Sequence, residues 1–312
     1  MLKIGLIDVD GHKFPNLPLM KISTYHRKLG HDVKFANSFE YYDKVYMTKV
    51  FTFTQDYTTI INSKEIIKGG TGYNLDIRLP DEIECQYPDY SLYNIKNVAY
   101  GYLTRGCPRN CDFCIVGEKE GLKSYKVANL DKFWKGQKEI KLLDPNLLGC
   151  NDHLELLDQL IKSKAYVDFT QGLDCRLLTI KNIEKINQLK IKMLHFAWDK
   201  EMDENLIIKN LELFNKYTLL DMRRKRVYVL TNFDTTFDYD LYRVETLKKL
   251  NYDPYIMIYN KDSADIKYKK LQRYINSKFI YLSKQINSFE EYTNCIKNIK
   301  NKNIENQIKI EI

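Results

Sequence analysis

The sequence predicts an α/β protein built on parallel β-sheets. Three observations support this fold class. From about residue 97 onward, short strand-like apolar runs alternate with helical patterns, and such alternation is typical of parallel strands joined by right-handed crossovers. The first ~95 residues begin with their own strand–helix–strand pattern. Hydrophobic residues make up 44% of the 312 residues, which is ample for a packed core.

The first 95 residues are predicted to form a separate, small Rossmann-like α/β domain. An amphipathic helix is expected to place Leu19, Ile22, His26 and Leu29 on one face and to end at Gly30. The expected helix spans 18–29, and the expected strands span 4–9, 32–36 and 44–47. The run Gly69-Gly70-Thr71-Gly72 predicts a turn that could face a ligand, but it is not a dinucleotide fingerprint.

Residues 96–262 carry the alternating pattern, and 263–312 form a basic, helical extension. The strand-like runs span 98–103, 140–143, 166–170, 192–197, 227–231 and 255–259. The helical patterns span about 130–138, 152–163, 179–189, 203–217, 238–250 and 264–277, the last with the apolar stripe Ala264, Tyr268, Leu271 and Ile275. Six strand–helix units are fewer than the eight of a closed barrel.

The charge and the cysteine content limit the function classes. No apolar run approaches the ~18 to 20 residues of a membrane span, and no secretory signal opens the chain. We therefore expect a cytoplasmic protein whose seven cysteines stay reduced. The net charge of +8 leaves two interpretations of the basic runs open, a nucleic-acid contact or a solvated surface. These runs are Arg223-Arg224-Lys225-Arg226 and, further on, Lys267, Lys269, Lys270, Arg273 and Lys278.

Three cysteines, Cys107, Cys111 and Cys114, form a Cys-x3-Cys-x2-Cys motif directly after the strand-like run 98–103. Three thiolates are one ligand too few for a closed tetrahedral zinc site or a fully cysteine-held iron–sulfur cubane. A 4Fe-4S cluster held by three cysteines keeps one iron open to a small molecule. The alternatives are a zinc site completed by Cys150, Cys175 or a histidine, and three unrelated thiols.

The motif, with the aromatic Phe113 before the third cysteine, resembles the signature of the radical S-adenosylmethionine (SAM) superfamily. The resemblance implies a partial (βα)6 TIM-like barrel over 96–262, with Cys107, Cys111 and Cys114 as ligands of a 4Fe-4S cluster and Phe113 beside the adenine. It also implies that S-adenosyl-L-methionine is bound at the open iron and cleaved to a 5′-deoxyadenosyl radical. A one-electron reductant of the flavodoxin or ferredoxin type would be a partner.

Polar residues after the later strands are the other candidate SAM contacts, since chemistry gathers at the carboxyl ends of barrel strands. Asp144 follows the second strand and is a substitute candidate for the acid that binds the SAM amino group in relatives. The run Gln171-Gly172-Leu173-Asp174-Cys175-Arg176 resembles a Gly-x-x-x-Arg segment whose arginine faces the SAM carboxylate, and Asp199 follows the fourth strand. Helix capping is the alternative for such residues, and it is preferred for Asn151, Thr179 and Asp203.

Cys150 and Cys175 lie near the same strand ends. A thiol there could donate a hydrogen atom to a substrate radical or add a cluster ligand. Buried, inert core cysteines are the more common case and are the preferred interpretation.

The N-terminal domain resembles that of the cobalamin-binding radical SAM subgroup. Asp10 and His12 match the D-x-H-x-x-G motif of domains that bind cobalamin through histidine, but Pro15 stands where the motif has glycine. The alternative is that Asp10 and His12 belong to a turn. The order of short motifs along the chain also resembles small radical SAM proteins of unknown role, some encoded by phages.

The sequence therefore predicts a radical SAM enzyme that abstracts hydrogen from an unknown substrate. A cobalamin-dependent methyltransferase and a nucleic-acid modification enzyme remain alternatives within that class. A non-catalytic metal- or nucleic-acid-binding module is the alternative from another class.

Overall fold

The computed structural model describes residues 1–11, 14–281 and 288–298 of the chain. These residues form two compact units, which are described separately below. The first unit comprises residues 1–171 and 188–192, and the second comprises 172–187 and the chain from 193 onward. Within the described ranges, no helix is both long and apolar enough to cross a membrane.

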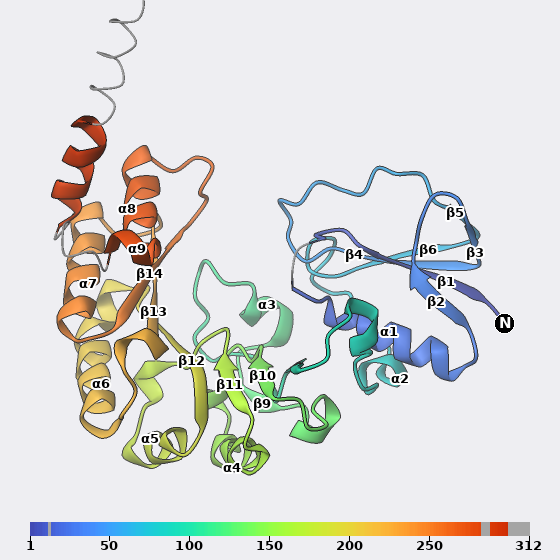
Figure 1. Ribbon diagram of the computed structural model, residues 1–312, viewed down its shortest axis with the longest axis horizontal. Helices are drawn as coiled ribbons and strands as arrows, with labels where there is room; N and C mark the ends of the chain where they lie inside the picture. Colours follow the sequence, from blue (N-terminus) through green and yellow to red (C-terminus); the bar gives the residue numbers. More distant parts are fainter. Residues whose placement is uncertain (12–13, 282–287, 299–312) are drawn as a thin grey trace, which may run out of the picture. The chain divides into compact units, whose positions relative to one another are not determined.

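The N-terminal part of the first unit is a four-stranded, wholly parallel sheet in the order β2-β1-β4-β6 (Figure 1). Its strands are β1 (Lys3–Asp8), β2 (Asp32–Phe35), β4 (Lys44–Thr48) and β6 (Ile66–Gly69). The chain leaves β1 toward β2, then returns past β1 to β4 and continues to β6. The strand order thus reverses between β1 and β4. Such a switch point opens a crevice beyond the carboxyl ends of the strands.

Helix α1 (Leu17–Lys28) covers one face of this sheet. The Asn16 side chain accepts a hydrogen bond from the Leu19 N–H and caps the helix start, and Gly30 follows the helix end with a φ of 76°. Leu19, Ile22 and His26 are buried as predicted. The prediction for Leu29 is wrong: its side chain is 54% exposed, because it lies at the helix C-cap beyond the packed turn.

The glycines of the Gly69–Gly72 run allow two loops to approach closely. Gly70 has a φ of 96°, and a Cβ there would lie 2.3 Å from the Lys49 carbonyl oxygen. The Gly72 N–H donates to the same carbonyl over 2.9 Å. The run therefore fastens the end of β6 to the segment after β4, and this packing explains its glycines without a ligand.

A second sheet contains six strands in the order β14-β13-β12-β11-β10-β7 (Figure 1). The strand pairs with a defined register are parallel, which confirms the predicted α/β class. The strands are β7 (Val98–Gly101), β10 (Glu139–Leu142), β11 (Tyr166–Phe169), β12 (Lys190–Ala197), β13 (Lys225–Thr231) and β14 (Asp253–Ile258). The predicted strand positions match these ranges closely.

The helices that connect or follow these strands also match the predicted ranges, with one exception. They are α4 (His153–Ser163), α5 (Ile180–Asn187), α6 (Glu204–Tyr217), α7 (Phe237–Lys249) and α8 (Ile266–Asn276), and α8 is followed by α9 (Lys278–Tyr281). The apolar stripe predicted for the last helix is buried in the second unit. Short helices α2 (Asp81–Glu84) and α3 (Val116–Glu120) lie in the first unit.

The exception is the helix predicted over 130–138, which is wrong. Only a 3-10 turn, Leu130–Lys132, forms there. Phe133 leaves the helical path and packs against Gly101, where a Cβ would lie 2.2 Å from the ring. Gly136 then turns with a φ of 94°. Tertiary packing of one aromatic ring on a glycine of β7 overrides the local helical pattern.

Strand β7 lies at the end of the six-stranded sheet, and a tyrosine covers its outer side. Tyr90, in the 3-10 turn Tyr90–Tyr93, accepts a hydrogen bond from the Tyr100 N–H over 2.9 Å. The same hydroxyl donates to the Phe133 carbonyl over 2.7 Å. A side chain from the N-terminal part thus satisfies a backbone donor that a neighbouring strand would otherwise pair.

Candidate functional site

The three motif cysteines lie on one loop that follows the first strand of the six-stranded sheet. After β7, the short strand β8 (Thr104–Arg105) pairs antiparallel with β9 (Tyr125–Lys126), and the loop between them carries Cys107, Cys111, Cys114 and helix α3. Because β7 and β10 are parallel neighbours, the segments that follow them leave from the same edge of the sheet. The cysteine loop therefore lies at the carboxyl end of the sheet's first strand, at the same edge as the segment that follows β10.

The base of this cysteine loop is fastened by one glutamate and one glycine. Glu120 accepts from the Arg105 guanidinium over 2.5 Å and from the Gly106 N–H over 3.1 Å. Gly106 has a φ of 76°, and a Cβ there would lie 2.1 Å from the Lys123 carbonyl oxygen. Only glycine fits this crossing, which brings the two ends of the loop together beside Cys107.

The segment after β10 contacts the first cysteine directly. The Asn146 side-chain amide donates a hydrogen bond to the Cys107 Sγ over 3.4 Å. The Asn146 Oδ1 accepts from the Gly149 N–H over 3.0 Å, which fixes the amide with its nitrogen toward the sulfur. The segment after β10 therefore presents a fixed side-chain donor to the first cysteine of the motif.

The three thiols fit an iron–sulfur cluster in chemical kind and number. None is in a disulfide; Cys107 and Cys111 are half-buried and Cys114 is exposed. Within the part of the chain that the structure describes, however, no group of three His, Cys, Asp or Glu side chains converges on a common metal position. The loop thus supplies side chains of a suitable kind, but their present positions do not form a metal-binding geometry. Phe113, next to Cys114, is half-buried on the same loop.

Asp144 is fully enclosed just after β10 and fastens the start of the cysteine loop. Its Oδ1 accepts from the Thr104 N–H over 2.5 Å, the Thr104 hydroxyl over 2.7 Å and the Leu103 N–H over 3.1 Å. Burial raises the pKa of this carboxyl to about 6, although the hydrogen bonds from Thr104 and Leu103 oppose the rise. The structure therefore gives Asp144 a structural role, and a contact with the SAM amino group remains a prediction.

Gln171, another candidate SAM contact, follows β11 and is exposed.

Arg176 is held by two carboxylates within the second unit. Its Nε donates to Asp174 Oδ1 over 2.7 Å, and its Nη1 pairs with Asp203 Oδ2. Asp174 also accepts from the Arg176 N–H and so caps the turn Cys175–Leu177. Asp174 and Asp203 thus fix the orientation of the guanidinium. A contact between its remaining donors and a SAM carboxylate remains a prediction.

The three helix caps predicted from the sequence have different outcomes in the structure. Thr179 and Asn182 exchange side-chain and backbone hydrogen bonds at the start of α5, so Thr179 caps as expected. Asp203 occupies the N-cap position of α6 without a side-chain capping bond, because its carboxylate pairs with Arg176 instead. The prediction is therefore right for the position of Asp203, but its side chain does not cap. Asn151 precedes the N-cap of α4, which is Asp152, so the capping prediction is wrong for Asn151.

Asp199 follows the end of β12 and lies near a buried arginine, Arg243. Its Oδ1 accepts from the Leu230 N–H over 3.2 Å. Burial raises its pKa to about 6, and the nearby Arg243 opposes the rise. Arg243 is itself completely buried, pairs with Asp240, and donates to the carbonyl oxygens of Trp198 and Leu230. Asp199 therefore belongs to a buried polar network that ties β12, β13 and α7 together.

Cys150 and Cys175 have the properties of core cysteines. Cys150 is 2% exposed and Cys175 is 1% exposed, each within its own unit. Burial raises the pKa of both thiols, that of Cys175 to about 12. Protonated, enclosed thiols are poor metal ligands, which favours the inert interpretation over a zinc site that either would complete.

The residues of the cobalamin-like motif are only partly described. The Asp10 carboxylate accepts from the Val50 N–H, the Phe51 N–H and the Thr54 hydroxyl, and so holds the segment after β4. This contact agrees with the alternative that Asp10 belongs to a turn. His12 lies outside the described residues.

The basic run at 223–226 is not a continuous surface patch. Lys225 is 2% exposed and donates to the Asn215 side chain. Arg226 forms two hydrogen-bonded contacts to Asp253, which also pairs with Lys278. Three of the basic residues considered for nucleic-acid contact are thus engaged in packing or ion pairs within the second unit.

Two contacts at the cysteine loop were not predicted from the sequence, namely those of Asn146 and Glu120. Asn146 follows Asp144 after the second strand, so the rule that strand ends meet at one edge could have indicated it. Glu120 has no comparable signal, because its partner Arg105 lies at the other end of an irregular loop.

The chain matches no family model and no curated protein with which it was compared.

Proposed function

We propose that this chain is a radical SAM enzyme. Cys107, Cys111 and Cys114 would hold a 4Fe-4S cluster, and S-adenosyl-L-methionine would bind at its open iron. The observation that carries the proposal is the position of the cysteine loop: it follows β7, at the end of a six-stranded parallel sheet whose strands alternate with helices. The partial (βα)6 TIM-like barrel of the superfamily is the finer fold that this sheet would represent.

The cluster, when bound, would supply the reductive cleavage of SAM to a 5′-deoxyadenosyl radical. The residues of this chain supply position and environment. Glu120 and Gly106 close the base of the loop, and Asp144 holds its approach from β8. The amide of Asn146 points at Cys107 Sγ and would stabilise that sulfur as a thiolate ligand. A cytoplasmic location and a flavodoxin- or ferredoxin-type reductant belong to the same proposal.

Anaerobic reconstitution with iron and sulfide tests the proposal on the full chain. We expect about four irons and four sulfides per chain, broad iron–sulfur absorbance, and release of 5′-deoxyadenosine from SAM after reduction. Replacement of Cys107, Cys111 or Cys114 by Ala should abolish the absorbance and SAM cleavage together, because alanine offers no donor atom.

Cys85→Ala is the matched control, since Cys85 is exposed, reduced and remote in sequence from the loop. It should leave iron, sulfide and SAM cleavage unchanged. A triple cysteine variant that still holds four irons and cleaves SAM would refute the assignment. One zinc per chain without sulfide would favour a non-catalytic metal-binding module instead.

A further inference from the structure

The N-terminal sheet carries an open cavity of about 530 Å³ at the carboxyl ends of β1 and β2. Leu6 and Ile7 both line it, although they pack into the cores on opposite faces of the sheet. The cavity therefore lies across the end of the sheet, next to the point where the strand order reverses. Crevices at this place in open parallel sheets are common ligand sites, and this volume suits a small organic molecule.

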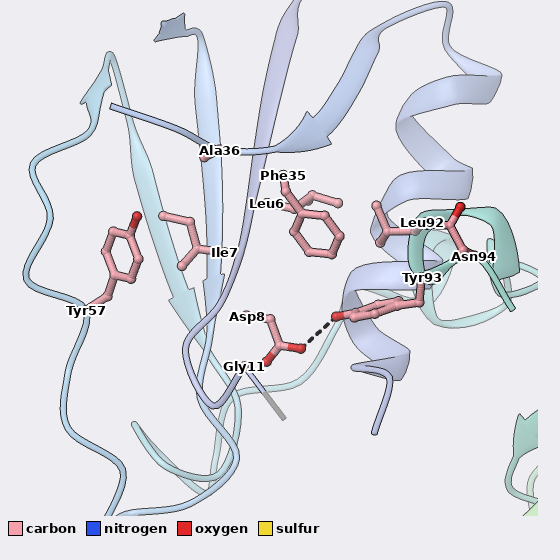
Figure 2. Close-up of a pocket in the computed structure, with 10 residues that line it drawn as sticks. All are labelled: Leu6, Ile7, Asp8, Gly11, Phe35, Ala36, Tyr57, Leu92, Tyr93 and Asn94. Carbon is pink, nitrogen blue, oxygen red and sulfur yellow. Dashed lines mark hydrogen bonds between the residues drawn. The ribbon is translucent and has the colours of Figure 1, made fainter. Parts of the chain in front are cut away.

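Aromatic side chains form much of the wall. Phe35, at the end of β2, meets Tyr93 edge to face with ring centroids 5.3 Å apart. Tyr57, from the segment after β4, lines the cavity beyond Ile7, on the side away from Tyr93 (Figure 2). Phe35 is 39% exposed, so part of its ring is accessible. Such walls suit a flat, apolar ring system.

One carboxylate oxygen of Asp8, a residue that lines this cavity, is buried and has no partner among the described residues. Asp8, the last residue of β1, accepts from the Tyr93 hydroxyl through Oδ2 over 2.8 Å (Figure 2). Its Oδ1 is buried and has no hydrogen-bond partner among the described residues. A buried acceptor of this kind is costly unless a donor satisfies it, and a bound ligand could supply that donor.

The charge of the lining residues limits the chemical class of the ligand further. Among the residues that the structure describes, the ten that line the cavity include Asp8 but no Lys, Arg or His. A phosphate or carboxylate group would meet the negative charge of Asp8 without a compensating cation from these ten residues. The wall therefore suits an uncharged ligand that combines a flat ring with hydroxyl or amine donors.

We propose that this cavity binds an uncharged nucleoside, with its ring against the aromatic wall and a hydroxyl or amine donating to Asp8 Oδ1. The site involves no residue of the cysteine loop and is independent of the radical SAM assignment. Cluster-free protein therefore tests it, and the outcome leaves the proposed function untouched.

Equilibrium binding of adenosine and guanosine to the full chain, prepared without iron, provides the test. We expect one site per chain for at least one of the two nucleosides. Asp8→Asn should lower the affinity at least tenfold, because a hydrogen bond to a charged acceptor contributes roughly ten- to more than a hundredfold. The corresponding 5′-monophosphate should bind at least tenfold more weakly than the nucleoside.

Two further variants make the result decisive. Asp32→Asn makes the same substitution at the opposite end of the sheet, at the start of β2, and should leave binding unchanged. Phe35→Ala removes a partly exposed ring and should weaken binding even if Asp8→Asn fails to fold. No binding of either nucleoside at millimolar concentration would overturn the proposal. So would binding that survives both Asp8→Asn and Phe35→Ala, or tighter binding of the monophosphate.

Discussion

The side-chain amide of Asn146 donates a hydrogen bond to the sulfur of Cys107 across 3.4 Å, between segments that follow neighbouring strands. This contact joins the segment after β10 to Cys107, the first residue of the cysteine motif. Since the Asn146 oxygen is held by the Gly149 N–H, the amide cannot turn its oxygen toward the sulfur without losing that bond. The Cys107 sulfur therefore has a fixed donor beside it from a residue outside the motif.

Asn146→Asp should slow the alkylation of Cys107 in cluster-free protein. The aspartate keeps the acceptor for Gly149, but it loses the donor to the sulfur and places a negative charge beside the reacting sulfur atom. A hydrogen bond of about 0.5 to 1.5 kcal/mol corresponds to roughly a two- to tenfold slower reaction. Iodoacetamide labelling followed by mass spectrometry of the Cys107 peptide measures this rate. Asn129→Asp, at an amide that contacts Gln159, is the control, and equal rates in all three proteins would contradict the assigned contact.

Arg176→Lys should weaken SAM binding while the iron content stays intact. A lysine cannot reproduce the guanidinium fork that Asp174 and Asp203 now orient. Loss of a charged hydrogen bond corresponds to roughly a ten- to more than hundredfold lower affinity, which anaerobic calorimetry on reconstituted protein can measure.

The control for that substitution is Arg226→Lys, which alters an arginine–aspartate pair elsewhere in the second unit. Both variants should lose some stability, but only Arg176→Lys should lose SAM affinity. Unchanged affinity in Arg176→Lys would leave Arg176 with a purely structural role between α6 and the Asp174 turn.

Asp144→Ala should destabilise the protein more than Asp144→Asn does. Alanine leaves the buried Thr104 and Leu103 donors unsatisfied, and each such group costs about 1 to 3 kcal/mol. Asparagine keeps one oxygen at the position that accepts all three bonds. Urea unfolding of the two variants and the parent protein measures the difference. A larger loss in the asparagine variant would show that the charge, rather than the acceptor, holds the loop.

The stability of the protein should fall as the pH drops from about 6.5 to about 4 because of His26. Burial, with smaller contributions from His31 and Lys44, lowers the pKa of this side chain from 6.5 to about 4. The unfolded chain binds the proton first, so the contribution is fully present above pH 6.5 and is lost as the pH falls through the folded pKa.

Unfolding midpoints measured between pH 4 and pH 7.5 test this effect. His26→Gln should show a shallower decline than the parent, whereas His153→Gln, at the first residue of α4, should decline like the parent. An identical pH profile for the parent and His26→Gln would contradict the role of His26.

The sequence predicted the repeating part of the fold and missed features that depend on distant packing. Strands such as β13 and helices such as α6 follow from apolar periodicity, which is a local property. The turn at Phe133 could not be predicted, because it depends on the missing side chain of Gly101 on another strand. The same limit applies to the site. The cysteine spacing is local, but the enclosure of Asp144 and the cavity beside Asp8 are assembled from separated segments.

The hydroxyl of Tyr90 has a consequence for how the chain can be divided. By occupying the Tyr100 N–H on the outer side of β7, it blocks the place where a strand from another molecule could add to the six-stranded sheet. A fragment that starts after the N-terminal domain would lack the Tyr90 side chain. The outer backbone groups of β7, beside the cysteine loop, would then be free to pair with a strand of another molecule. Truncation there should therefore promote self-association, and expression boundaries placed before Tyr90 are preferable to those placed after it.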